Sequence, residues 1–256
     1  MRIADSVALV TGGASGLGLG VAGEPVAQGG RVVVLDLPRA CPSEVVETLG
    51  ERGRVVEADV TRPSEVEGAV AEAHAAFGRL DSVISCAGIL RSERVLHRDG
   101  DVHSLDNFRR HTEVNLIGVF DVIRHAVRFI ASNDPSPDGE RGVIINVVSV
   151  AEFEGQVGQS AYAASKGGLV SMTLPLAREL GPLGIRAVCI CPGAMDTPML
   201  ASMPDAARHE LAEANAFPLR LGRPHELGKM IAAVLENVFI NGEAIRFDAG
   251  TRMSAR

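Results

Sequence analysis

The stretch that decides the fold runs from Ser6 to Gly18 and reads SVALVTGGASGLG. Its first part, Val7–Val10, is a continuously apolar run that predicts a buried strand. The glycines come next and lead directly into a helix expected over Leu17–Gln28. Because glycine has no side chain, backbone N–H groups and the helix N-terminus can approach a pyrophosphate at such a turn. The order of strand, glycine-rich turn and helix therefore predicts a dinucleotide site, held by Gly12, Ser15, Gly16, Leu17 and Gly18.

The position of Asp36 supports this interpretation. The glycine spacing is TGxxxGxG instead of GxGxxG, so the turn alone is also compatible with tight packing and no ligand. A second strand is expected over Val32–Leu35, however, and Asp36 follows at its end. A carboxylate there accepts both adenosine-ribose hydroxyls and repels a 2′-phosphate, which favours NAD over NADP. Arg39 lies close enough in the sequence to keep NADP as the alternative.

Strands and helical stretches alternate along nearly all of the 256 residues. Most of the strand-like runs are apolar throughout, as is typical of strands covered by helices on both faces. This order predicts a single α/β domain, built on a doubly wound parallel sheet between two layers of helices. Seven strands are expected, at Val7–Val10, Val32–Leu35, Arg54–Glu57, Ser82–Cys86, Gly142–Val148, Ile185–Cys191 and Ala244–Phe247.

Three longer helices and several irregular segments are expected between these strands. Pro25 falls inside the first helix, where we predict a kink or an early end. The stretch Met195–Phe217 contains methionines and interrupting prolines, and it predicts either a mobile lid over an apolar substrate or a helical hairpin packed against the body. The helices are Ser64–Phe77, which begins with a capping serine, Asn107–Ile130 and Ala161–Leu180, and the long loops are Arg91–Ser104 and Ser132–Arg141.

Composition and charge exclude several classes of protein. A net charge of −7 argues against binding to nucleic acid. No apolar run reaches the ~20 residues that a membrane helix needs, and the N-terminus reads as a strand instead of a targeting peptide, which predicts a cytoplasmic protein. The histidines and cysteines lack metal-ligand spacing, so no metal site is expected. The cysteines are expected to be free thiols: Cys41, Cys86, Cys189 and Cys191.

Tyr162 and Lys166 are the most informative pair of residues. Tyr162 is the only tyrosine of the chain, and the only other lysine is Lys229. Four residues apart, the two side chains lie on one face of a helix. We expect the ammonium of Lys166 to lower the pKa of the phenol, so that Tyr162 exchanges a proton with an alcohol or carbonyl oxygen. Ser149 follows the strand Gly142–Val148, where its hydroxyl could bind the reacting oxygen.

Several motifs together resemble the short-chain dehydrogenase/reductase family over the whole chain, which implies a Rossmann-type fold. Within it, Asp36-Leu37-Pro38 and the segment Phe153–Gln159 look like the short-chain 3-hydroxyacyl-CoA dehydrogenases, also called type 10 17β-hydroxysteroid dehydrogenases. The family motifs are TGGASGLG, Asp59-Val60, Cys86-Ala87-Gly88, Asn115-Leu116-Ile117-Gly118, Ser149, Tyr162-Ala163-Ala164-Ser165-Lys166 and Pro192-Gly193.

The resemblance implies roles for individual residues. Asn115 completes a catalytic tetrad with Ser149, Tyr162 and Lys166. Gln156 and Gln159 are expected to position the substrate, together with Ser149 and Tyr162. Besides the glycine turn and Asp36, the residues expected at the cofactor are Asp59, Val60, Cys86, Ala87, Gly88, Tyr162, Lys166, Pro192, Gly193 and Thr197. The family motif has asparagine where Ser85 stands, so a hydrogen bond between central strands is expected to be lost.

The expected function is NAD-dependent interconversion of a secondary alcohol and a ketone by a homotetramer. The substrate expected from the resemblance is a 3-hydroxyacyl-CoA, with hydroxysteroids as a second class. An NADPH-dependent 3-oxoacyl reductase of fatty-acid synthesis is the enzymatic alternative. A non-catalytic scaffold or RNA-processing subunit is the alternative from another class.

Overall fold

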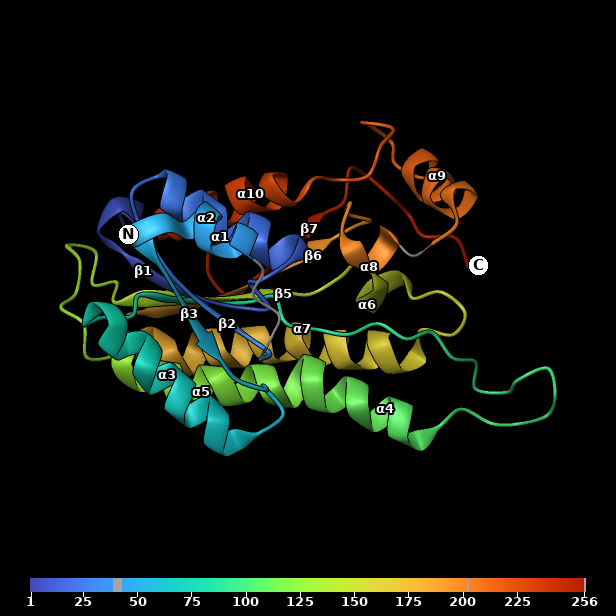
Figure 1. Cartoon of the computed structure of the whole chain (residues 1–256), viewed down its shortest axis with the longest axis horizontal. Helices are drawn as coiled ribbons and strands as arrows, with labels where there is room; N and C mark the ends of the chain where they lie inside the picture. Colours follow the sequence, from blue (N-terminus) through green and yellow to red (C-terminus); the bar gives the residue numbers. More distant parts are fainter. Residues whose placement is uncertain (39–42, 202, 256) are drawn as a thin grey trace.

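The computed structural model describes residues 1–38, 43–201 and 203–255. This part of the chain forms a seven-stranded sheet in which every neighbouring pair is parallel, in the order β3-β2-β1-β4-β5-β6-β7 (Figure 1). The strands are β1 (Val7–Thr11), β2 (Arg31–Asp36), β3 (Gly53–Glu57), β4 (Ser82–Ser85), β5 (Gly142–Val147), β6 (Ile185–Pro192) and β7 (Ala244–Phe247). The predicted doubly wound sheet of seven strands is confirmed.

Helices cover both faces of the sheet. One face carries α1 (Gly16–Ala27), α2 (Ser43–Leu49) and α10 (Pro224–Glu236), and the other carries α3 (Pro63–Phe77), α5 (Gly118–Ile130) and α7 (Ser160–Leu180) (Figure 1). Each face has its own buried cluster, because alternate residues of β1 point to opposite sides: Leu9 packs with the α3, α5 and α7 side and Val10 with the α1 and α10 side. The remaining helices are α4 (Leu105–Thr112), α6 (Ala151–Glu154), α8 (Pro198–Ala201) and α9 (Asp205–Glu213).

Two helix expectations need correction. Asn107–Ile130 was expected as one helix, but a π-helical turn, Glu113–Ile117, separates α4 from α5. The predicted cap at Ser64 is also wrong. Helix α3 begins with Pro63 after the N-cap Arg62, because the fixed backbone angle of proline suits the first helical position.

Pro25 affects α1 less than the sequence suggests. The helix continues through it to Ala27, so Pro25 lies in the last turn, and the helix ends one residue before the expected Gln28. Pro25 lacks the N–H group that would bond to the Val21 carbonyl, but the helix still continues for two more residues before its C-cap at Gln28.

The connections at the carboxyl edge of the sheet are long. The segment Arg91–Ser104, between β4 and α4, extends from the body as an arm closed by a bridge between Leu96 and Val102 (Figure 1). From β1, the strands β2 and β3 are added on one side of the sheet, and β4 and the later strands are added on the other side. Doubly wound parallel sheets bind ligands at the carboxyl ends of the strands where the order of addition changes sides in this way.

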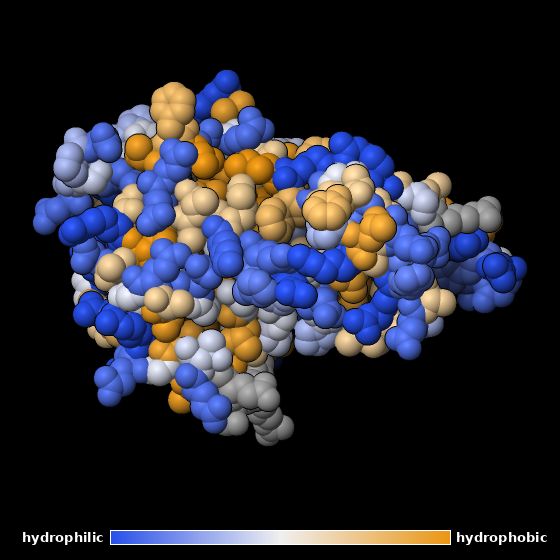
Figure 2. Space-filling view, turned by 90° about the horizontal axis from the view of Figure 1, so that it is seen from above, coloured by the Kyte–Doolittle hydropathy of each residue, from blue (hydrophilic) through white to orange (hydrophobic). Residues whose placement is uncertain are grey.

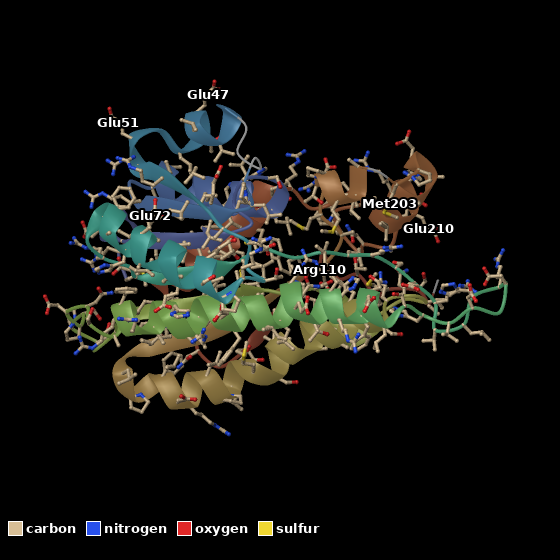
Figure 3. All side chains as sticks on the ribbon, turned by 60° about the horizontal axis from the view of Figure 1, so that its bottom comes forward. Glu47, Glu51, Glu72, Arg110, Met203 and Glu210 are labelled. Atoms are coloured by element: carbon tan, nitrogen blue, oxygen red, sulfur yellow. The ribbon has the colours of Figure 1, made fainter. Side chains whose placement is uncertain are left out.

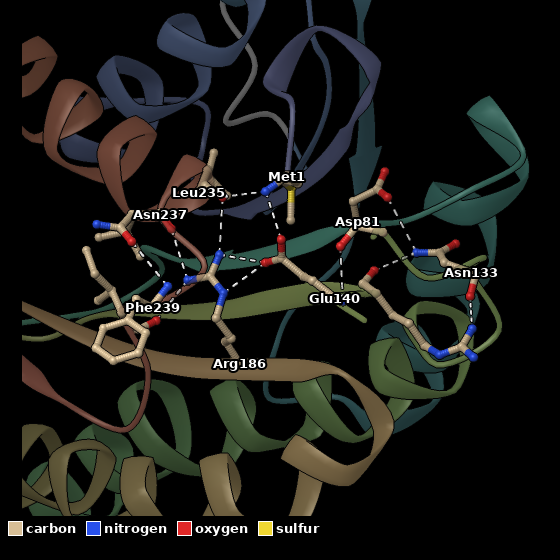
Figure 4. A network of polar contacts seen from close by, with 12 residues as sticks. Met1, Asp81, Asn133, Glu140, Arg186, Leu235, Asn237 and Phe239 are labelled. Atoms are coloured by element: carbon tan, nitrogen blue, oxygen red, sulfur yellow. Dashed lines mark hydrogen bonds and ion pairs between the residues drawn. The ribbon is translucent and has the colours of Figure 1, made fainter. Parts of the chain in front are cut away.

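A buried polar network holds the opposite end of β6. Arg186 donates to Glu140 Oε1 at 2.8 Å and to the carbonyls of Val234, Leu235 and Ile240 (Figure 4). Both charged side chains are almost completely buried. The network ties the loop before β5 to the end of α10 and to the segment that leads into β7.

The outer surface of α1, α2 and α10 is mixed in character, because apolar and charged side chains are interspersed on it (Figure 2).

Candidate active site

The glycine-rich loop is packed so closely that side chains would not fit. Gly12 has a φ angle of +65°, and a Cβ there would lie 2.7 Å from both the N and Cα atoms of Ala87. A Cβ on Gly18 would collide with the carbonyl oxygen of Gly12. The loop therefore rests directly on the segment that follows β4, and α1 starts at Gly16 with its N-terminus at the carboxyl edge of the sheet. This is the arrangement in which backbone N–H groups can hold a pyrophosphate.

Asp36 and Asp59 follow the neighbouring strands β2 and β3. Asp36 Oδ2 accepts a hydrogen bond of 2.9 Å from the Ala14 N–H group, which joins the end of β2 to the glycine loop. Partial burial would raise the pKa of Asp59, but hydrogen bonds from Thr61 and the charges of Arg110 and Arg62 outweigh it and lower the pKa. Both carboxylates face a nucleotide-sized opening at this edge.

A cavity of about 280 Å³ runs between these loops. Most of the cofactor residues expected from the sequence line it: Gly12, Ser15, Gly16, Leu17, Gly18, Asp36, Asp59, Val60, Cys86, Ala87, Gly88 and Thr197. Other residues that line the cavity were not predicted from the sequence, among them Ile89, Arg110, Val114 and Met199. Arg110 comes from α4 and donates to Thr61 Oγ1 at 3.3 Å (labelled in Figure 3). The sequence does not indicate that Arg110 lines the cavity, because many charged residues lie on helix surfaces. Met199 could have been predicted as a lining residue, because it is two residues from the predicted cofactor residue Thr197.

Asn115 lies in the π-helical turn between α4 and α5. Its Oδ1 accepts from the Ile89 N–H at 2.8 Å, and its Nδ2 donates to the Ile89 carbonyl and to Ser165 Oγ, each at 3.0 Å. The side chain is completely buried. Asn115 therefore connects the segment after β4 with α7, the helix that carries Tyr162 and Lys166, and π-turns of this kind often occur at functional sites.

Lys166 is buried between β5 and the segment after β4. Its Nζ donates to the Val147 carbonyl at 3.0 Å, and a Cβ on Gly88 would lie 3.3 Å from Nζ and 3.2 Å from Asn115 Oδ1. Gly88 thus leaves room beside it for both side chains. Burial lowers the pKa of Lys166 to about 8, so this ammonium can release its proton close to neutral pH.

Tyr162 and Ser149 are hydrogen-bonded to each other. The Ser149 hydroxyl also accepts from the Ala151 N–H at 3.1 Å, which holds it at the end of β5. The expectation that Lys166 lowers the pKa of Tyr162 is not met in this structure. Burial raises the pKa of Tyr162, the hydrogen bond with Ser149 opposes that effect in part, and the Lys166 ammonium is directed to the backbone of β5.

The two glutamines expected at the substrate lie in the loop between α6 and α7. The Gln156 side chain donates to the Ser254 carbonyl at 3.3 Å, and Gln159 Oε1 accepts from the Gln156 N–H at 3.0 Å. An ion pair of 2.8 Å between Glu154 and Arg246 ties the same loop to β7. The structure therefore engages both glutamines in local contacts and fixes their loop against the C-terminal segment.

The predicted cofactor residues Pro192 and Gly193 and the predicted lid lie at and after the end of β6 in the chain. Pro192 ends β6, and Gly193 lines a second cavity, of about 400 Å³, beside α10. Met195, which the predicted lid includes, is buried in the core and forms a bridge with Gly222, so it cannot belong to a mobile lid. Helices α8 and α9 follow it at the surface, where Arg208 pairs with Asp196 at 2.8 Å.

Several further expectations concern single residues. Cys86, Cys189 and Cys191 are free thiols. Ser85 Oγ is buried without a hydrogen-bond partner among the described residues, as expected where the family has asparagine. Arg39 and Cys41 lie outside the described residues. Within the described ranges, no cluster of three metal-ligating side chains occurs, and no helix has the length and apolarity to cross a bilayer.

Comparison with known proteins places this geometry in a family. A family model described as short chain dehydrogenase matches residues 6–208. The 3-hydroxyacyl-CoA dehydrogenase type-2 proteins of Bos taurus and Homo sapiens are each 48% identical over 248 residues, covering 96% of this chain and 95% of each relative. The crystal structure of 3-hydroxyacyl-CoA dehydrogenase type-2 from Mycobacterium avium matches with a TM-score of 0.92 at 35% identity, covering 98% of this chain and 97% of that one. The chain is an oxidoreductase that belongs to the short-chain dehydrogenase family.

Proposed function

We propose that this protein interconverts 3-hydroxyacyl-CoA and 3-oxoacyl-CoA with NAD as cofactor, and that hydroxysteroids are a second substrate class. The observation that carries the proposal is the position of Asn115 and Lys166 beside Gly88, a residue that lines the cavity, together with the hydrogen bond between Ser149 and Tyr162. The relatives with 48% identity are named for 3-hydroxyacyl-CoA dehydrogenation, which supports this substrate over other alcohols.

The residues around the cavity fit a nicotinamide dinucleotide. A glycine-rich loop suits a pyrophosphate, because its backbone N–H groups can be approached closely, and the Asp36 carboxylate suits the ribose hydroxyls. The negative charge of Asp36 opposes a 2′-phosphate, which favours NAD. When bound, the nicotinamide accepts or supplies the hydride, and the protein provides binding, orientation and proton transfer.

Proton transfer is assigned to three side chains. Tyr162 as the phenolate takes the proton of the substrate alcohol during oxidation, and as the phenol it returns the proton to the carbonyl oxygen during reduction. The Ser149 hydroxyl donates a hydrogen bond to the same oxygen. Lys166, whose pKa lies at about 8, passes the proton on, and Asn115 holds the backbone that surrounds it. Met195 is buried and is therefore left out of the proposed substrate lid, which consists of the rest of the segment Met195–Phe217.

The proposal includes a cytoplasmic homotetramer. Exposed apolar side chains follow the outer faces of α4, α5 and α7, where a second copy could cover them: Leu105, Phe108, Ile117, Phe120 and Leu174. An NADPH-dependent 3-oxoacyl reductase remains the second enzymatic candidate, because it would use the same four catalytic side chains, although Asp36 opposes it.

Oxidation of NADH by the purified protein with acetoacetyl-CoA tests the proposal. NADPH in place of NADH, and a hydroxysteroid with NAD, are the parallel assays. Turnover with NADH and acetoacetyl-CoA is the expected result. Turnover with NADPH alone would replace the proposal by the reductase, and turnover with the steroid alone would change the substrate. No turnover in any assay would contradict the enzymatic proposal.

A further inference from the structure

His111 is a buried titratable side chain next to the site for which the proposed mechanism has no role. It lies in α4, one helical turn before Asn115, with 0% of its surface exposed. Its ring stands edge-on to the ring of Tyr162, with the two centroids 6.4 Å apart and an angle of 79° between the planes. His111 therefore contacts the expected acid–base residue directly, while it touches neither the cavity nor Ser149.

Both ring nitrogens of His111 have fixed partners. Nδ1 lies 2.8 Å from the Asn107 carbonyl oxygen, which can only accept, and Nε2 lies 3.1 Å from the Arg91 backbone nitrogen, which can only donate. Only the neutral imidazole with its hydrogen on Nδ1 satisfies both contacts. An apolar residue here would leave the part-buried Arg91 N–H group without this partner.

His111 and Asn115 act on the same piece of backbone. Four residues apart, they lie on one face of the helical segment. Asn115 binds the N–H and the carbonyl of Ile89, and His111 binds the N–H of Arg91. Two side chains thus replace the partners that a neighbouring strand would offer to alternate residues. The segment that they hold follows Gly88 directly, and the side chains of Asn115 and Lys166 both lie beside Gly88.

The next residues connect this segment to the loop before α7. The Glu93 N–H donates to the Gly158 carbonyl at 2.8 Å, and the Glu93 carboxylate accepts from Asn107 Nδ2 at 2.6 Å. The Asn107 carbonyl in turn binds His111. The backbone from Ile89 to Glu93 is therefore held between α4 with its π-helical turn and the loop of the two glutamines, and His111 is its central contact.

We propose that His111 is a positioning residue, which holds the Ile89–Arg91 backbone and the Tyr162 ring in the geometry needed for proton transfer. The expected effect of His111 on kcat rests on the proposed function, whereas its expected effect on the position of the Tyr162 ring does not. A shift of about 1 Å in a reacting group is enough to cost about a hundredfold in rate. The bound imidazole prevents such a shift by joining both elements.

Three substitutions at one position test the inference. In His111→Gln, the side-chain oxygen can still accept from Arg91, whereas in His111→Asn the shorter amide reaches only the Asn107 carbonyl. His111→Leu removes both contacts. The matched control is His125→Leu, which changes a buried histidine of α5 that lies outside the cavity and has no contact with Tyr162. Each variant is measured for kcat and KM with acetoacetyl-CoA, for the Kd of NADH, and for thermal unfolding.

Tyr162 also supplies a readout that does not depend on turnover. The chain has one tyrosine and no tryptophan, so the near-ultraviolet circular dichroism of the tyrosine and the ultraviolet titration of the phenol report on Tyr162 alone. If the wild type proves inactive with acetoacetyl-CoA, the proposed function fails, and the tyrosine signal still tests the position of Tyr162 in each variant.

The expected pattern is specific. In His111→Leu and His111→Asn, we expect kcat to fall about tenfold or more, the tyrosine signal to change, and the Kd of NADH to stay within about twofold. His111→Gln should keep most of the wild-type kcat and the wild-type tyrosine signal, and His125→Leu should alter only thermal unfolding. Folded His111→Leu and His111→Asn variants with wild-type kcat and tyrosine signal would overturn the inference. Equal losses in His111→Gln and His111→Leu would overturn it as well.

Discussion

The Asp36 carboxylate is bound to the Ala14 backbone: Oδ2 accepts the Ala14 N–H at 2.9 Å, and Oδ1 accepts the Leu37 N–H at 2.8 Å. The carboxylate is thus held at the edge of the cavity by the glycine loop itself. Because its position is fixed, its negative charge would act at a defined place on the adenosine ribose of the proposed cofactor.

Removing the charge of Asp36 should therefore change cofactor preference. For Asp36→Ser we expect the ratio of kcat/KM for NADH to that for NADPH to fall by at least about tenfold, or about 1.4 kcal/mol. Asp36→Asn retains an acceptor for the Ala14 N–H without the charge and should shift the ratio in the same direction. Parallel assays with both cofactors measure it, and an unchanged ratio in both variants would rule out this role.

Tyr162→Phe should abolish turnover. The hydroxyl is the proposed proton donor and acceptor, and loss of such a group lowers kcat by about a hundredfold to ten-thousandfold. The Kd of NADH should remain close to that of the wild type, because the phenyl ring keeps the packing against His111. Measurement of NADH oxidation and of NADH binding separates the two effects, and a largely active variant would remove Tyr162 from the mechanism.

The free energy of unfolding should depend on pH through Lys166. Burial lowers its pKa to about 8 from an ordinary value of 10.5, so between these values the unfolded chain binds more protons than the folded one. Stability from this group then rises with pH, by about 2 kcal/mol between about pH 8 and pH 10. Urea unfolding of the wild type should show this rise relative to Lys166→Met, in which the group is absent. Parallel pH curves for the two proteins would show that the pKa is not lowered.

A side chain at Gly18 should destabilise the protein. The added Cβ would collide with the Gly12 carbonyl oxygen, which is backbone and cannot move away cheaply. For Gly18→Ala we expect a loss of about 1–3 kcal/mol and weaker NADH binding, as for other overpacked sites. Gly68→Ala is the matched control: nothing lies within 4 Å of its Cβ in α3, so we expect a gain of about 0.5–1 kcal/mol. Equal melting temperatures for the two variants would contradict this account of the loop.

The buried ion pair of Glu140 and Arg186 should be costly to break from one side. Glu140→Ala leaves the guanidinium buried without its carboxylate partner, at an expected cost of about 3–5 kcal/mol. Glu140→Met combined with Arg186→Met should lose less than the single variant, because no guanidinium is left without a partner, while both variants equally remove the carboxylate that lies 2.8 Å from the Met1 ammonium. Urea unfolding measures both, and a double variant less stable than Glu140→Ala would show that the pair itself stabilises the fold.

The sequence by itself determined the order of the elements and most of the residues that line the cavity at the carboxyl edge of the sheet. Apolar runs such as Val7–Val10 and Ile185–Cys191 predict strands because their periodicity is local, and the carboxyl ends of parallel strands bring Gly12, Asp36 and Asp59 to one edge whatever the details of packing. Ser149, Tyr162 and Lys166 could likewise be placed from strand ends and helical spacing.

Only the tertiary structure decided which partner each side chain meets. The π-turn at Asn115, the contact of His111 with Arg91, and the direction of the Lys166 ammonium toward Val147 depend on residues distant in sequence. The raised pKa of Tyr162 has the same origin, because burial is a property of the assembled core. Periodicity and motif spacing describe the chain along its own axis, whereas hydrogen bonds and desolvation arise between segments that packing brings together.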